Sequence, residues 1–243
     1  MSKFDTYFKS AFTVDNVIFG FDEGDLKVLL IKRIEEPDLG KWGLPGYFVR
    51  PTEDLDTAAI RVLKELTGLT NVYLEQVKTF GAVGRHAFGR VITVAYYSLV
   101  KIADFNPRPD YSIADDVRWF SVADVPDLAF DHLEILDVCF ERLKRQVRVR
   151  PVGFELLPPK FTLTELQHLY EAILQTELDK RNFRKKILSM NLLIDLDQTQ
   201  EGVAHRPARL YQFDREKYQE FLNEGFSFEV KESKRKEKLA AQS

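Results

Sequence analysis

Residues 44–69 constrain what this chain can fold into more than any other stretch. In this stretch, a loop that contains Pro, Gly and polar residues is followed by the apolar spacing of a helix. The pattern is formed by apolar residues at three- and four-residue spacing: Ala59, Val62, Leu63 and Leu66. This spacing predicts a helix over residues 56–66, and Gly68 can end it. Side chains at positions 62, 65 and 66 lie within one turn of such a helix, so they can converge on one point.

The polar positions of this stretch resemble the Nudix box, which has a Gly, then a Glu, then the run Arg-Glu-hydrophobic-x-Glu-Glu-x-Gly-hydrophobic. Six positions match at the right spacing: Glu53, Arg61, Leu63, Glu65, Gly68 and Leu69. Three positions depart, with Tyr47 in place of the first Gly, Val62 in place of the Glu after Arg, and Leu66 in place of the last Glu. The resemblance implies a Nudix-like α/β (α+β) fold for residues 1–148, with a mixed sheet sandwiched by helices.

The departures remove carboxylates that a Nudix hydrolase uses to hold its divalent cation. Magnesium requires hard oxygen ligands in near-octahedral geometry, and in such enzymes it stabilises the leaving diphosphate and helps to form the attacking hydroxide. Only Glu65 remains on the helix, with Glu53 in the preceding loop, a pair that suits weak magnesium binding at most. We therefore expect no catalytic residues, no enzyme activity, no metal site and no cofactor. A hydrolase of nucleoside diphosphate derivatives with an accessory domain remains the alternative.

Composition narrows the class of protein further. The chain has 243 residues and 44% hydrophobic content, enough for one large or two small domains, and its net charge of −3 does not indicate nucleic acid. The single cysteine, Cys139, excludes an intrachain disulfide and is expected in the core. No apolar run reaches membrane-spanning length, and the N-terminus lacks the apolar core of a signal peptide. We expect a cytoplasmic protein with no membrane partner.

Strand and helix patterns alternate before position 148. Strands are predicted at residues 11–21, 26–33, 77–85, 91–100 and 117–122, and a long amphipathic helix at 130–147. The sequence Asp-Glu-Gly-Asp at residues 22–25 predicts a hairpin turn between the first two strands. Residues 149–160 hold several Pro and Gly residues and are predicted to link two domains.

Residues 161–228 predict a second domain of a different kind. Thr162 and Glu165 have the spacing of a capping box at the start of a helix. Asp179 is a favourable N-cap for the next helix, residues 180–190.

Two strand patterns follow these helices, at residues 192–196 and 208–213, with a polar loop between them that contains His205. Two helices followed by a β-hairpin are typical of a winged helix-turn-helix domain. The tail, residues 229–243, is low in complexity and is predicted to be disordered.

The second helix of this domain has a basic outer face. Phe183, Ile187 and Met190 recur at inward spacing, which leaves the basic residues outward. A helix of this kind fits the major groove, where Arg, Lys and Asn read base edges, while nearby cations neutralise phosphates. The candidate DNA-binding residues are Lys180, Arg181, Asn182, Arg184, Lys185, Lys186, Arg206 and Arg209. Two alternatives to DNA binding remain, because the domain as a whole is not basic. The basic residues could form a solvated helix face, or the domain could bind protein.

A degenerate Nudix domain followed by a winged helix resembles the Nudix-related transcriptional regulators of bacteria. Residues 179–186 are similar to the recognition helix of that family. The resemblance implies a homodimeric repressor on palindromic double-stranded operator DNA, with half-sites ~34 Å apart or a multiple of that. One branch of the family senses ADP-ribose and controls NAD metabolism, and another, in Bacteroidetes, senses pentose sugars and controls their catabolism.

The resemblance also implies a small-molecule effector in the Nudix domain. The candidate effector-binding residues are Arg33, Glu53, Arg61, Glu65, Arg85, His86 and His132. Because the box has lost carboxylates, a magnesium-dependent grip on a diphosphate is less attractive, and a pentose such as arabinose is the preferred effector, with ADP-ribose as the alternative. Structural roles remain open for three of the candidates: a Glu53–Arg61 ion pair, a helix cap at His132, and a solvent-facing turn at His86.

Regulation is expected to follow from a population shift. An effector in the Nudix pocket would favour a dimer geometry whose helices no longer match the operator, which requires different effector affinity in the two states.

Overall fold

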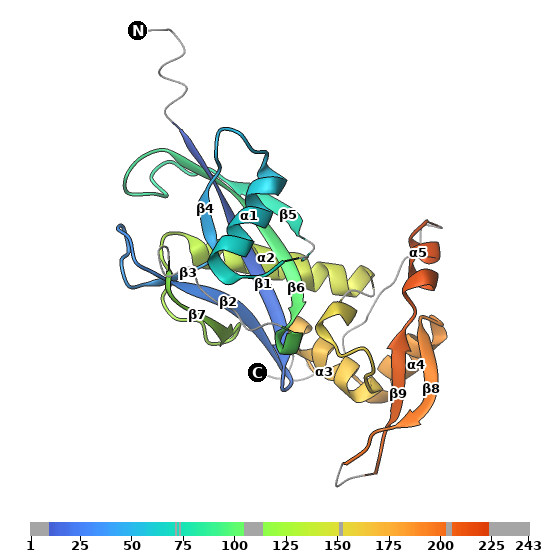
Figure 1. Ribbon diagram of the computed structural model, residues 1–243. Helices are drawn as coiled ribbons and strands as arrows, with labels where there is room; N and C mark the ends of the chain where they lie inside the picture. Colours follow the sequence, from blue (N-terminus) through green and yellow to red (C-terminus); the bar gives the residue numbers. More distant parts are fainter. Residues whose placement is uncertain are drawn as a thin grey trace, which may run out of the picture. The chain divides into compact units, whose positions relative to one another are not determined.

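The computed structural model describes residues 10–70, 72, 74–104, 114–150, 153–202 and 206–223 (Figure 1). The chain divides into two compact units between Arg142 and Leu143, with the turn Glu23–Asp25 grouped with the second unit. The predicted domain boundaries at 148/149 and 160/161 remain predictions, and the predicted disordered tail, 229–243, lies outside the described residues. No helix in the described part of the chain has both the length and the apolar character needed to cross a membrane.

The first unit is built on one mixed sheet in which the main strands follow the order β3-β2-β1-β6-β5. Its strands are β1 (Ala11–Asp22), β2 (Asp25–Arg33), β3 (Trp42–Gly43), β4 (Gly46–Phe48), β5 (Glu75–Phe80), β6 (Val91–Lys101) and β7 (Ala114–Ser121). β1 and β6 are parallel, whereas β4 pairs antiparallel with β1 and β7 pairs antiparallel with β2. The expected mixed sheet is confirmed.

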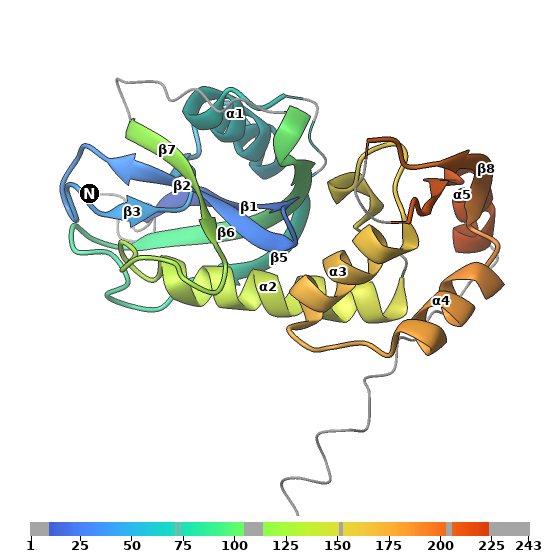
Figure 2. The ribbon, with the colours of Figure 1, turned by 90° about the horizontal axis from the view of Figure 1, so that it is seen from below.

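Two helices cover opposite faces of this sheet (Figure 2). They are α1 (Leu55–Thr67) and α2 (His132–Val149), and a 3-10 turn, η2 (Ile102–Asp104), follows β6. The side chain of Asp54 accepts a hydrogen bond from the Thr57 N–H at the start of α1, and Gly68 ends the helix in the left-handed region at φ 76°. Both helices therefore lie close to where the sequence predicts them.

Alternation along β1 places Val14 and Ile18 on the same face of the sheet, the face that α1 covers. Successive strand residues point to opposite faces of a sheet. Val14 packs with Val62 and Leu66 of α1 in one apolar cluster, and Ile18 packs with Leu63 in a second. The helix face predicted from apolar spacing is thus the face that covers the sheet. Cys139 of α2 is fully buried, and burial raises the pKa of its thiol to about 12, as expected for a core residue.

The second unit has the helix and strand order of a winged helix. Its elements are η3 (Phe154–Leu156), α3 (Leu163–Leu174), α4 (Lys180–Ser189), β8 (Leu193–Thr199), β9 (Arg209–Phe213) and α5 (Arg215–Asn223). The capping box of Thr162 and Glu165 is present, and Asp179 caps α4 by accepting from the Asn182 N–H. β8 and β9 pair antiparallel, as expected. Helix α5 was not predicted from the sequence.

The strand predicted at residues 77–85 is wrong in its second half, because β5 ends at Phe80 and residues 81–90 form a loop. Gly84 and Gly89 in this segment have φ of +82° and +142°, and such backbone conformations interrupt an extended strand. The guanidinium of Arg90 holds the base of the loop by donating to the carbonyl oxygens of Gly81 and Ala82. This correction matters because the loop carries two of the predicted effector residues.

Candidate effector site and nucleic-acid interface

Arg61 occupies the centre of the Nudix-like box. Its Nε and Nη2 donate to the two carboxylate oxygens of Glu53 at 2.8 and 2.5 Å. Its Nη1 donates to Glu65 Oε2 at 2.8 Å, and Nη2 also reaches the carbonyl oxygen of Phe48 at 2.9 Å. The expected Glu53–Arg61 ion pair is therefore present, and it extends to the second box glutamate.

Arg50 also binds the same two glutamates. Its backbone N–H donates to Glu53 Oε1 at 2.8 Å, and its Nη2 donates to Glu65 Oε1 at 3.1 Å. The hydrogen bonds from Arg61 lower the pKa of Glu53 to about 2, and the Arg50 N–H acts in the same direction. Arginine side chains therefore balance the negative charge of both carboxylates, as a bound metal ion would.

The residues at the box do not fit a magnesium site. Val62 and Leu66 stand where the motif has glutamates, and both are buried in the apolar cluster beneath α1. No group of three or more His, Cys, Asp or Glu side chains that could hold a metal occurs among the described residues. The arginine-bound pair of Glu53 and Glu65 lacks the free oxygen ligands that a hard cation requires.

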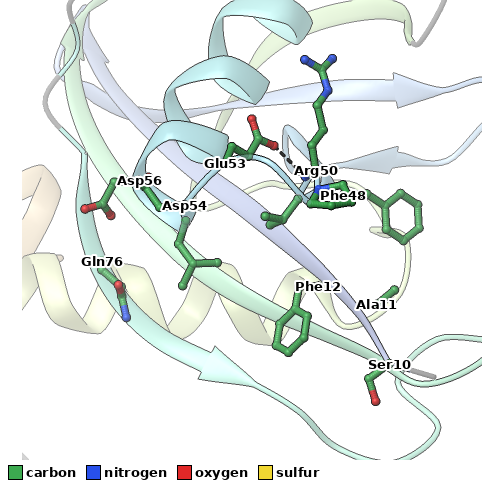
Figure 3. Close-up of a pocket in the computed structure, with 12 residues that line it drawn as sticks. Ser10, Ala11, Phe12, Phe48, Arg50, Glu53, Asp54, Asp56 and Gln76 are labelled. Carbon is green, nitrogen blue, oxygen red and sulfur yellow. Dashed lines mark hydrogen bonds between the residues drawn. The ribbon is translucent and has the colours of Figure 1, made fainter. Parts of the chain in front are cut away.

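An open cavity of about 860 Å³ lies beside the box (Figure 3). Two half-exposed rings, Phe12 and Phe48, line it together with Glu53, Asp54 and Asp56. The close-up shows the hydrogen bond between the Glu53 carboxylate and Arg50 at its edge. Of the predicted effector residues, only Glu53 lines this cavity, and its carboxylate is already bound.

A second cavity, of about 150 Å³, collects most of the predicted effector residues. Arg33, Arg85, His86 and His132 all line it. These side chains come from the end of β2, the 81–90 loop and the start of α2, so the fold unites residues that are far apart in the sequence. Arg61 and Glu65, in contrast, are engaged in the box.

A stack of planar groups forms one wall of the second cavity. The His86 ring lies on the Phe130 ring with centroids 5.0 Å apart and an interplanar angle of 19°. The Arg33 guanidinium lies 4.6 Å from the centroid of Phe130. Because aromatic faces and guanidinium planes stack well on other planar groups, this wall suits a flat ring. His86 is half-buried, and burial followed by the charge of Arg85 lowers its pKa. It is not simply a solvent-facing turn residue.

A buried polar cluster forms the floor of the same cavity. Arg85 donates two hydrogen bonds to Asp131, at 2.8 and 2.5 Å, and its side chain is only 5% exposed. A second carboxylate, that of Asp15, lies 4.0 Å from the same guanidinium and accepts a 2.7 Å hydrogen bond from Thr93. Gly46 permits this arrangement, because a Cβ at that position would lie 1.8 Å from Asp15 Oδ1.

His132 belongs to this cluster and does not cap a helix, so the capping interpretation is wrong. Its Nδ1 accepts a 2.9 Å hydrogen bond from the backbone N–H of Leu44, which places the ring proton on Nε2. That nitrogen lies 3.5 Å from Asp15 Oδ1. Burial lowers the pKa of His132, which favours the neutral imidazole.

Sequence reasoning missed three residues of this site: Asp15, Phe130 and Asp131. A signal existed for Asp15, because an aspartate in the middle of the apolar run 11–21 is costly to bury without partners. Phe130 has a positive φ of 53° and its N–H donates to Asp38 Oδ2, features that local patterns do not reveal.

The outer face of α4 presents most of the predicted DNA-binding residues. Lys180, Arg181, Asn182 and Lys185 are exposed, and Lys186 is half-buried. Phe183 and Ile187 face the core, as the spacing predicts. Arg184 differs, because its Nη2 donates to Thr164 Oγ1 of α3 at 2.9 Å and so joins the two helices.

The hairpin of the second unit carries the other two predicted cations. Arg206 is exposed. Arg209 donates to Asp195 Oδ2 across the strand pair at 2.8 Å, and this hydrogen bond raises its pKa. Its charge is therefore partly offset. His205 of the polar loop lies outside the described residues.

Comparisons with known proteins agree with both units. Residues 10–139 match the NUDIX domain family, and residues 153–213 match the NrtR DNA-binding winged helix domain. The ADPR responsive transcriptional repressor NtrR of Acinetobacter baylyi is 38% identical over 208 residues, covering 85% of this chain and 83% of the relative.

Solved structures extend the likeness to most of the chain. The crystal structure of Shewanella oneidensis NrtR complexed with a 27mer DNA has a TM-score of 0.76 and 34% identity, covering 90% of this chain and 99% of that chain. The NUDIX domain of the same protein complexed with ADP ribose has a TM-score of 0.53 and 38% identity, covering 57% of this chain and 92% of that domain.

The fold and the two sites define a transcriptional regulator built from a Nudix sensor unit and a winged helix. This chain belongs to the Nudix-related regulator family with an NrtR-type winged helix.

Proposed function

We propose that this protein is a transcriptional repressor whose Nudix unit binds ADP-ribose and whose winged helix binds operator DNA through α4. The observation that carries the proposal is the similarity along most of the chain to the ADPR responsive repressor of Acinetobacter baylyi. The pentose effector preferred from the sequence has no comparable support, and the ADP-ribose alternative fits the relatives better.

The second cavity supports ADP-ribose over a free pentose. The stacked wall of Phe130, His86 and Arg33 suits an adenine ring, which a pentose lacks. Carboxylates on the cavity wall, such as Glu35 and Asp15, suit the hydroxyl groups of ribose. Arg33 and Arg85 are cations that a diphosphate would seek. The 150 Å³ cavity is smaller than a typical ligand pocket, so we expect the 81–90 loop to open as the effector enters.

We further propose that the Nudix unit binds its effector without hydrolysing it. Arg61 and Arg50 bind the two glutamates that remain in the box. The other two glutamate positions of the motif hold Val62 and Leu66, whose side chains are buried. Val62 and Leu66 supply no general base to activate water, and Glu65 is bound by both arginines. A homodimer on a palindromic operator completes the proposal, since two-fold symmetry would present two copies of α4 to successive major grooves.

One titration tests the function. The full-length protein is added to a fluorescent DNA duplex that it has itself enriched from a randomised pool, and anisotropy is followed as ADP-ribose or arabinose is added, with and without magnesium. ADP-ribose alone should change the DNA affinity at micromolar concentration, without magnesium and without turnover. A response to arabinose only would restore the sugar interpretation, and phosphate-ester products that require magnesium would support the hydrolase.

A further inference from the structure

The outer face of α4 contains one large apolar side chain among its polar residues. Leu188 is 43% exposed. It lies three residues after Lys185 and seven after Arg181, which places all three on one side of the helix. The core side is already filled by Phe183 and Ile187, so Leu188 is not needed for packing within the unit.

A single exposed leucine is ordinary on a protein surface, and its position on α4 is what distinguishes this one. Two neighbouring side chains in this half of the helix make hydrogen bonds within the protein. Ser189 Oγ donates to the carbonyl oxygen of Lys186 at 2.7 Å, and Arg184 is bound to Thr164 of α3. The C-terminal half of the outer face therefore offers an apolar contact, while its N-terminal half offers Arg181 and Asn182 as hydrogen-bond donors.

We propose that Leu188 is a specificity-determining residue that contacts the C5-methyl group of a thymine in the operator. This inference rests on the proposed DNA binding by α4. The methyl group of thymine is the apolar feature of the major groove, and apolar side chains read it by contact. Leu188 adds a preference for A·T pairs that the cationic residues of the helix cannot supply.

The helix geometry places the thymine relative to the other base contacts. Seven residues of α-helix span roughly 10 Å, and base pairs stack about 3.4 Å apart along the duplex. For a helix that lies along the groove, the thymine read by Leu188 is about three base pairs from the base read by Arg181.

Replacing thymine by uracil removes only the methyl group, so it tests the contact directly. Each thymine of the duplex enriched from a randomised pool is replaced singly by deoxyuridine, and the dissociation constants of the full-length protein and of Leu188→Ala are measured. Loss of one buried methyl should weaken binding by the unchanged protein about fourfold at one thymine of each half-site. The same replacement should leave Leu188→Ala unaffected.

A matched control uses another large exposed apolar residue of this unit, Ile194 of β8, which is 45% exposed. Ile194→Ala should keep the full sensitivity to deoxyuridine. If every deoxyuridine replacement affects the unchanged protein and Leu188→Ala equally, or affects neither, the contact does not exist. Enrichment of no specific sequence would also overturn the inference, and it would locate the failure in DNA binding itself.

Discussion

Arg85 of the 81–90 loop, which lines the second cavity, and Asp131, the residue that precedes α2, form a bidentate ion pair. The pair is nearly buried, with side chains 5% and 19% exposed. A diphosphate that enters the cavity would compete with Asp131 for the same guanidinium, because carboxylate and phosphate groups both accept paired hydrogen bonds from arginine. Effector binding at this cavity would therefore be connected to the start of α2 through one side chain.

Asp131→Asn should destabilise the effector-free protein and strengthen its response to ADP-ribose. The change leaves a buried arginine with a weaker partner, and we expect the free energy of unfolding to fall by about 2 kcal/mol. ADP-ribose should then raise the melting temperature of the variant more than that of the unchanged protein. Asp127→Asn is the control, since Asp127 is 86% exposed and pairs only with Lys41 among the contacts described. Equal shifts in Asp131→Asn and in the unchanged protein would show that Asp131 does not influence effector binding.

Phe130→Leu should weaken ADP-ribose binding about fivefold, because it removes the ring on which His86 and Arg33 stack. Isothermal titration calorimetry measures the loss. Val83→Ala provides a control on the adjacent loop, as Val83 is 91% exposed and does not line the cavity. An unchanged affinity of Phe130→Leu would place the adenine elsewhere.

Restoring the motif at position 62 should fail to restore catalysis. Val62 is fully buried under α1, so Val62→Glu would bury a carboxylate at a cost on the order of 4 kcal/mol or more. Ile60→Glu on the same helix should cost little, because Ile60 is 55% exposed. Chemical denaturation compares the two variants. A folded Val62→Glu protein that hydrolyses ADP-ribose with magnesium would contradict this prediction and support the hydrolase alternative.

Glu53 should contribute stability that depends on pH. Hydrogen bonds from Arg61 hold its pKa near 2, below the ordinary 4.5. A depressed carboxyl pKa stabilises the folded state above pH 4.5, and this stabilisation is lost as the pH falls from 4.5 toward 2. Acid unfolding followed by circular dichroism should therefore be less steep in Glu53→Gln over this range. Identical acid transitions would contradict the assignment of the ion pair.

The double change Arg181→Ala and Lys185→Ala should abolish specific DNA binding and leave the fold intact, because both side chains are exposed on α4. Removal of two cations should also flatten the dependence of any residual affinity on salt. Lys160→Ala is a control outside α4, where the amine donates to Gln198. If the double variant binds the selected duplex as tightly as the unchanged protein, α4 is not the recognition helix.

Much of the fold follows from local patterns in the sequence. The apolar spacing of residues 56–66 and the capping signals at Asp179 and Thr162 predict helices that the structure contains, because caps and periodicity act within a few residues. The outward basic face of α4 follows from the same periodicity. The sequence wrongly predicts that the strand continues through residues 81–85, because glycines with positive φ in this loop interrupt an extended backbone.

The amino-acid order alone determined the Nudix-like unit, the winged helix and the loss of box carboxylates, because each depends on spacing along the chain. Only the tertiary structure decided which predicted effector residues lie together. It placed Arg61 and Glu65 in an internal ion-pair network and gathered Arg85, His86 and His132 around Asp15 and Phe130. Those partners lie tens of residues apart, and such contacts are set by the packing of the sheet and helices, which no local pattern encodes.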